Sequence, residues 1–184
     1  MFEANLKFIG RHAQEIRELA PSKLAGGQAQ QDQTIFSRYV DILPVAVVLG
    51  FLCHRRSGVD DMPGASASET NILLEQVNQV RGSLEFAYRL ILLLHDKEHL
   101  PLQARMDRAF RYDSDAEKRA VGDVIFFEYM RGGIDLLYEK LLADASSTEE
   151  DVKNLYAFVR EIQDLYVKEV SIEDILALCN EATV

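Results

Sequence analysis

Residues 122–142 decide the fold, and they read Gly-Asp-Val-Ile-Phe-Phe-Glu-Tyr-Met-Arg-Gly-Gly-Ile-Asp-Leu-Leu-Tyr-Glu-Lys-Leu-Leu. Apolar side chains recur at positions 126, 130, 134, 137 and 141, which is the spacing of one face of an α-helix. Gly132 and Gly133 interrupt this helix, and each glycine costs roughly 1 kcal/mol relative to alanine. The pair therefore predicts a kink or a close approach of another backbone. We favour close helix packing, because no strand precedes the pair and no Lys-Ser/Thr follows it, as a phosphate-binding loop requires.

A second helix is expected over residues 34–56, capped by Asp32 or Thr34. Its middle, residues 42–52, is apolar on nearly every side, which is typical of a helix buried among others. Pro44 should bend this helix or restart it. The same periodicity predicts further helices over residues 3–19, 69–80, 84–96, 102–111, 145–168 and 172–180. No run of alternating β-branched residues indicates a sheet.

These patterns predict an all-α fold. A chain of 184 residues is long enough for one domain with a well-buried core, and we expect a single helical domain over residues 1–184. In this multi-helix bundle, a central apolar helix near residues 40–54 is crossed by the helix that carries Gly132 and Gly133. The Gly-containing residues 21–33 and the Ser/Gly/Pro-rich residues 57–67 are expected to be flexible connectors.

The formal net charge of −10 is concentrated toward the C-terminus. Residues 116–184 carry seven Lys/Arg and fifteen Asp/Glu, a balance of −8, whereas residues 1–60 carry seven and six, a balance of +1. Broad binding of nucleic acid by the C-terminal part is therefore not expected, because phosphate contacts need a basic surface. The acidic excess indicates either a solubilising surface or a face that meets a basic partner.

The two cysteines, Cys53 and Cys179, lie far apart in the sequence, and neither has a second thiol at metal-ligand spacing. No metal site and no cofactor is expected. The start Met1-Phe2-Glu3 does not resemble a signal peptide, and the apolar run at residues 42–53 is too short to cross a bilayer. We expect a cytoplasmic protein with no membrane partner.

Seven basic residues are candidates for contact with phosphate or nucleic acid: Arg38, His54, Arg55, Arg56, Arg105, Arg108 and Arg111. The last three are spaced three apart, so they can share a helix face. The alternative for residues 54–56 is that they complement the negative end of a helix dipole.

Three carboxylates, Glu128, Asp135 and Glu139, stand one and two turns apart on the Gly-Gly helix and could share a face. Such a group could gather a divalent cation in a small hydrolase or nuclease. The alternative is a solvated face, or a pair between Glu139 and a cation from a neighbouring helix. No residue is assigned a catalytic role. The acids and histidines of residues 95–99 lack the spacing of a metal site and are expected to be solvated.

Apolar and aromatic residues near the C-terminus suggest a partner interface. Their number exceeds what one short helix face can bury, and aromatic residues are favoured at protein contacts. They predict a homodimer or a contact with another subunit; the alternative is that they cover the core of a monomer. The four residues are Tyr156, Phe158, Tyr166 and Ile175.

Two blocks together resemble a known family. Residues 36–56 form an apolar helix with Gly50 near its end and a basic cluster after it, and residues 126–137 form an acidic-aromatic helix with a Gly-Gly pair. This order is similar to the small helical accessory proteins associated with DNA phosphorothioation systems of bacterial defence. The resemblance implies a non-enzymatic adaptor that binds protein subunits of an antiviral system. A nucleic-acid-contacting module and a small metal-dependent hydrolase or nuclease remain as alternatives.

Overall fold

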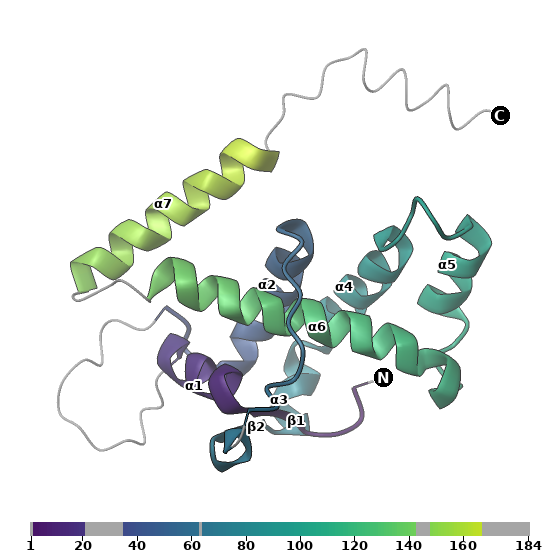
Figure 1. Cartoon of the computed structure of the whole chain (residues 1–184), viewed down its shortest axis with the longest axis horizontal. Coiled ribbons are helices and arrows are strands. Elements are labelled where there is room, and N and C mark those ends of the chain that lie inside the picture. Colours follow the sequence, from purple (N-terminus) through teal and green to yellow (C-terminus); the bar gives the residue numbers. More distant parts are fainter. Residues whose placement is uncertain (1, 21–34, 63, 143–147, 167–184) are drawn as a thin grey trace. The chain divides into compact units, whose positions relative to one another are not determined.

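The computed structural model describes residues 2–20, 35–62, 64–142 and 148–166 (Figure 1). The chain divides into two compact units, residues 1–143 and 144–184. The first unit holds a small sheet and six of the seven α-helices found in the described residues; the second holds α7 (Thr148–Tyr166). The prediction of one helical domain over residues 1–184 stays a prediction, because a division into compact units does not test it. Residues 21–33 and 172–180, a predicted connector and a predicted helix, lie outside the described residues.

A two-stranded antiparallel sheet corrects the all-α prediction. Strand β1 (Leu6–Ile9) pairs with β2 (Glu69–Ile72), with Leu6 opposite Ile72. Residues 3–9 and 69–72 were therefore wrongly predicted as helix; the helices α1 (Gly10–Leu19) and α3 (Leu74–Gln79) begin only after the strands. Strands of four residues are too short for their alternation to stand out against helical spacing. The fold is nevertheless predominantly helical.

Helix α2 (Tyr39–Leu52) crosses α6 (Ala116–Leu141), and this pair makes the most extensive contact between elements (Figure 1). Helix α2 runs through Pro44 without restarting. It ends at Leu52 rather than Arg56, because His54 adopts a left-handed conformation with φ 53°. The Arg55 amide then donates to the Gly50 carbonyl at 2.8 Å, a Schellman-type helix end that turns the basic residues out of the helix.

Three glycines lie where α2 and α6 cross. A Cβ at Gly133 would stand 1.7 Å from the carbonyl oxygen of Ala46, and a Cβ at Gly50 would stand 2.0 Å from that of Tyr129. A Cβ at Gly132 would lie 2.2 Å from the Arg55 carbonyl oxygen. The backbone of α6 therefore touches the backbone of α2 and of the segment that follows it, which only residues without a side chain permit.

Helices α4 (Arg81–Leu94) and α5 (Leu102–Phe110) form a helical hairpin. Arg89 of α4 donates to the Ala109 carbonyl at 2.8 Å and stacks over the Phe110 ring, whereas Arg105 of α5 donates to the Leu93 carbonyl. A 3-10 turn (Ala65–Ala67) precedes β2. Among the described helices, none has both the length and the apolar character needed to cross a membrane.

A buried tyrosine provides a first test of the core. Tyr88 is 1% exposed, its ring lies 5.2 Å from the Phe126 ring, and its hydroxyl donates to Asp123 Oδ1 at 3.0 Å. We expect Tyr88→Phe to lower the free energy of unfolding by about 1 kcal/mol, the usual contribution of one intramolecular hydrogen bond. Urea unfolding should show a lower midpoint with an unchanged slope. Tyr138→Phe is the control, because that hydroxyl bonds to the exposed Glu18, so its loss should be smaller. Equal losses of stability in the two variants would contradict a buried hydrogen bond between the Tyr88 hydroxyl and Asp123.

Candidate functional site

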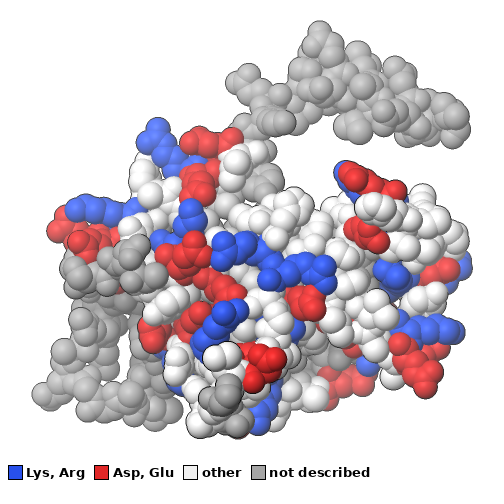
Figure 2. All heavy atoms as spheres, viewed as in Figure 1, with Lys and Arg blue, Asp and Glu red and all other residues white. Residues whose placement is uncertain are grey.

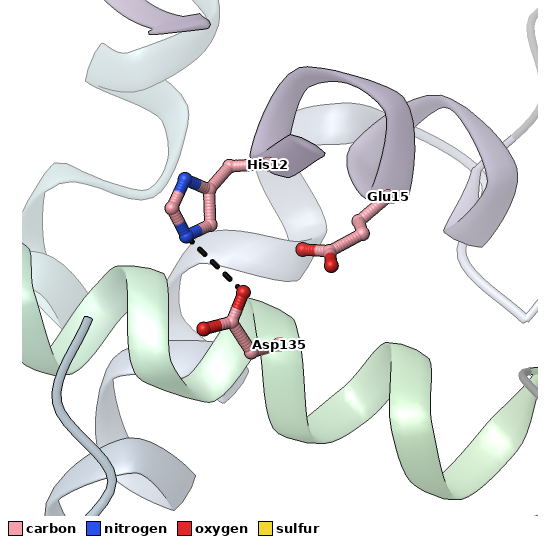
Figure 3. Close-up of side chains that lie close together, drawn as sticks. All are labelled: His12, Glu15 and Asp135. Atoms are coloured by element: carbon pink, nitrogen blue, oxygen red, sulfur yellow. Dashed lines mark ion pairs between the residues drawn. The ribbon is translucent and has the colours of Figure 1, made fainter. Parts of the chain in front are cut away.

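A histidine and two carboxylates meet where α1 packs against α6. His12 and Glu15 come from α1 and Asp135 comes from α6, and Figure 3 shows the three side chains converging from the two helices. Each offers one ligand-type atom, and these atoms all lie within 4.8 Å of one another. Among the described residues, this is the group of His, Cys, Asp and Glu with the spacing to hold a metal ion. We refer to these three residues as the α1–α6 cluster.

The start of α1 fixes where the cluster lies. Gly10 has a φ of 62°, and its amide donates to the Ser68 carbonyl at 2.9 Å. The Asp60 carboxylate accepts from the Arg11 amide at 2.8 Å, so an acid distant in sequence satisfies the free N-terminus of the helix. This hydrogen bond is the main reason why the pKa of Asp60 is lowered. A Cβ at residue 10 would lie 1.9 Å from Asp60 Oδ2, so the close contact requires glycine.

His12 is 1% exposed, and its Nε2 atom faces two oxygens. It lies 3.1 Å from Asp135 Oδ1 and 3.2 Å from Ser57 Oγ. A single imidazole N–H cannot point at both, so at least one of these contacts is not a well-directed hydrogen bond. Asp135 Oδ1 is also buried without a well-aligned donor, as is Glu15 Oε2. The cluster thus contains two buried carboxylate oxygens with unused acceptor capacity.

The combination of Ser57, His12 and Asp135 is not a hydrolase triad. In a Ser-His-Asp triad, the hydroxyl and the carboxylate contact different nitrogens of the imidazole. Here both contact Nε2. The Ser57 hydroxyl also accepts from the Arg11 guanidinium at 2.7 Å, and Ser57 is buried. The geometry therefore gives no support to a serine nucleophile at this place.

The pKa values of the two carboxyl groups in the cluster are shifted in opposite directions. Burial first, and then the charge and hydrogen bonding of the neighbouring Asp135, raise the pKa of Glu15 to about 7 against the opposing charge of Arg11. Burial would also raise the pKa of Asp135, but hydrogen bonds and charge from His12, Ser57 and Arg11 outweigh it and hold that pKa below its usual value. Near neutral pH Glu15 is therefore about half protonated, whereas Asp135 is ionised.

Ser57 connects the cluster to the rest of the unit. Its amide donates to the Glu128 carbonyl at 3.0 Å, and its carbonyl accepts from Arg131 Nε at 2.9 Å. Burial lowers the pKa of the Arg131 guanidinium. The start of the predicted connector 57–67 is thus held against α6 by its backbone groups.

Only one member of the cluster was named from the sequence. Asp135 was grouped with Glu128 and Glu139, but the structure does not bring these three acids together: Glu128 pairs with Arg56, and Glu139 pairs with Arg55 at 2.8 Å. The pairing of Glu139 with a cation from another element matches the alternative reading. His12 and Glu15 were missed because α1 meets α6 only in the folded chain; 124 positions separate Arg11 from Asp135.

The predicted phosphate-contact residues are mostly engaged within the protein. Arg38 binds Asp41 at 2.6 Å, and Arg55 and Arg56 bind the two acids named above. Arg111 binds Asp107 at 2.8 Å, and Arg105 donates to the carbonyls of Leu93 and Leu100. His54 is exposed at the end of α2.

Arg108, the remaining arginine of the seven candidates, lies close enough to His95 for its charge to affect the pKa of that histidine. Burial, Arg56 and Arg108 together lower the pKa of His95, whose Nδ1 lies 3.1 Å from the Tyr129 hydroxyl. Figure 2 shows Lys and Arg interspersed with Asp and Glu on the face that it displays. The basic side chains on that face therefore lie among acidic ones.

Of the four residues predicted at a partner interface, Tyr156 is exposed and Phe158 is buried. Ile175 and the side chain of Tyr166 lie outside the described part of the structure. The interface stays a prediction.

A different set of exposed apolar side chains forms two rows on the α4–α5 hairpin. On α4 they are spaced four residues apart, and on α5 they have the same spacing, so each row follows one line along its helix. Exposed apolar side chains collected on one structural unit mark interaction sites more often than isolated ones do. We call them the hairpin rows: Phe86, Leu90 and Leu94 on α4, and Leu102, Met106 and Phe110 on α5.

No family model matches the chain, and no curated protein or solved structure is significantly similar to it.

Proposed function

We propose that this protein is a non-enzymatic adaptor that binds another protein subunit through the hairpin rows. The observation that carries the proposal is the exposure of six large apolar side chains at regular helical spacing on α4 and α5. The occupant that fits such rows is the apolar face of a helix, which presents anchors at the same spacing. The resemblance to accessory proteins of DNA phosphorothioation systems suggests the partner: a cytoplasmic subunit of a bacterial defence complex.

Charge pairing also favours a protein partner over nucleic acid. Arg38, Arg55 and Arg56 each already bind a carboxylate of the same chain. A phosphate would have to displace these acids, and the overall charge of −10 would oppose its approach. The three carboxylates that the enzymatic alternative needs are not grouped in the described part of the chain, because Glu128 and Glu139 pair with arginines.

The experiment is co-purification of the tagged chain with the proteins encoded beside its gene, at physiological salt. We expect Phe86→Ser combined with Leu90→Ser to reduce the retained partner at least tenfold, since loss of an interface anchor costs about 2 kcal/mol or more. Both side chains are exposed, so the melting temperature should change little. Light scattering on the same samples distinguishes a second copy of this chain from a different subunit.

The matched control replaces two exposed apolar side chains that lie outside the rows. Val59→Ser combined with Leu73→Ser should leave the partner bound. If Phe86→Ser combined with Leu90→Ser retains as much partner as the wild type, or if the wild type retains no partner, the adaptor proposal is wrong.

A further inference from the structure

We propose that the α1–α6 cluster is a binding site for a divalent transition-metal ion such as Zn²⁺, with His12 Nε2 and one carboxylate oxygen each from Glu15 and Asp135 as ligands. The site is independent of the hairpin rows, so it adds a function that the adaptor role does not require. Its ligands come from α1 and α6, and an ion would therefore tie these two helices together.

The donor atoms are already close to coordinating geometry. His12 Nε2 and Asp135 Oδ1 are 3.1 Å apart, near the separation of two adjacent ligands that each lie about 2.1 Å from a zinc ion. The Glu15 oxygen completes the group within 4.8 Å, and a shift of about 1 Å by this side chain brings it to bonding distance. Figure 3 shows the Glu15 carboxylate directed toward the same space as His12 and Asp135.

Two buried carboxylate oxygens of the cluster can accept further interactions, which favours a bound cation between them. Glu15 Oε2 and Asp135 Oδ1 are buried, and apart from the 3.1 Å contact between His12 Nε2 and Asp135 Oδ1 neither oxygen has a hydrogen-bond donor in the described structure. Buried carboxylate oxygens without a donor are unfavourable, and a metal ion would satisfy both. His12 is almost fully buried and faces them, which makes this a mixed imidazole and carboxylate site rather than a patch of surface acids.

The surrounding residues are placed to orient the ligands. Arg11 donates to Asp135 Oδ2 at 3.1 Å, which leaves Oδ1 directed toward His12. Such outer contacts hold a ligand in one orientation in metal sites. Arg11 is itself substantially exposed, so its charge opposes the ion less than a buried guanidinium would. A nitrogen ligand beside two carboxylates favours Zn²⁺ over Mg²⁺ or Ca²⁺, which prefer oxygen ligands alone.

The test is titration of the metal-free protein with ZnCl₂, followed by calorimetry and by the melting temperature. We expect one equivalent of Zn²⁺ to bind and to raise the melting temperature, because the ion binds only the folded chain. Glu15→Gln should weaken binding by about 100-fold, since loss of even an outer-shell partner weakens metal binding by about 10–100-fold. Asp135→Asn should do the same, and MgCl₂ should not compete at about 1 mM.

Two controls separate this site from surface binding. Glu18→Gln removes an acid from the same helix, one turn beyond Glu15, and should leave the affinity within about twofold of the wild type. His99→Gln removes the exposed histidine that lies 2.7 Å from Asp96, the other described contact of this type, and should also have no effect. Circular dichroism verifies that each variant is folded. If Zn²⁺ does not bind the wild type up to about 1 mM, or if Glu15→Gln binds it unchanged, the proposal is wrong.

Discussion

Gly133→Ala is expected to lower the free energy of unfolding by about 3 kcal/mol, at the upper end of the usual range for overpacking. The new Cβ would lie 1.7 Å from the Ala46 carbonyl oxygen and 2.4 Å from its carbonyl carbon. These are backbone atoms inside α2, so they cannot turn aside as the end of a side chain can. Relief requires α2 and α6 to separate, which opens the most extensive helix contact of the fold. Urea unfolding followed by far-UV circular dichroism measures the loss.

Gly82→Ala is the matched control. Gly82 lies in α4, and a Cβ there would meet no atom within 4 Å. Alanine is the better helix former, so this variant should gain up to about 1 kcal/mol. The two substitutions are chemically identical, and their opposite signs would isolate the close helix crossing as the cause. A Gly133→Ala variant as stable as the wild type would show that the helices do not meet at this point in solution.

The crossing of α2 and α6 shows what the sequence could predict. The apolar stretch of α2 and the Gly-Gly pair of α6 carry their signal in consecutive residues, so helix type and close packing follow from local pattern. Helix ends were less well predicted, because a left-handed residue such as His54 is not marked by glycine. The strands β1 and β2 were missed because each is short, and its pairing depends on a partner about 60 positions away.

The α1–α6 cluster shows what the sequence could not predict. Glu15 lies three positions after His12, a spacing that also occurs on many solvated helices, and nothing local connects either residue to Asp135. The contact depends on the packing of α1 against α6, a tertiary arrangement that no short motif records. The roles of Arg55 and Arg56 were missed for the same reason, because their acidic partners lie on α6. Basic residues that looked available in the sequence are ion-paired in the fold.

Glu15→Gln is expected to remove a pH dependence of stability from the metal-free protein. The pKa of Glu15 rises from 4.5 to about 7 on folding, so the folded chain holds this proton more strongly than the unfolded chain does. The contribution to stability is complete below about pH 4.5 and is lost as the pH rises through 7. The full shift would correspond to about 3 kcal/mol, but Glu15 is partly exposed, and solvent screening reduces the expected loss to about 1–2 kcal/mol.

The measurement is urea unfolding of both proteins at pH 5, 6, 7 and 8 with a chelator present. Glutamine resembles the protonated acid and can still donate to Asp135, so the variant should match the wild type at pH 5 and exceed its stability at pH 8. Two other groups do not disturb the comparison. The lowered pKa of Asp135 matters only below about pH 4, and the lowered pKa of His95 has the opposite sign but is common to both proteins.

Glu18→Gln again provides the control, because Glu18 sits one turn beyond Glu15 on α1 and contacts the Tyr138 hydroxyl instead of Asp135. The charge of Glu18 is the smallest of the named causes that raise the pKa of Glu15, so Glu18→Gln should keep most of the pH dependence of the wild type. A constant difference between Glu15→Gln and the wild type from pH 5 to pH 8 would show that Glu15 ionises normally in the folded chain. The carboxylates would then not share a proton, and the contact of Glu15 with Asp135 would have to be looser than the structure places it. The metal titration remains a separate test, since it measures ion binding at fixed pH rather than the proton held in the ion's absence.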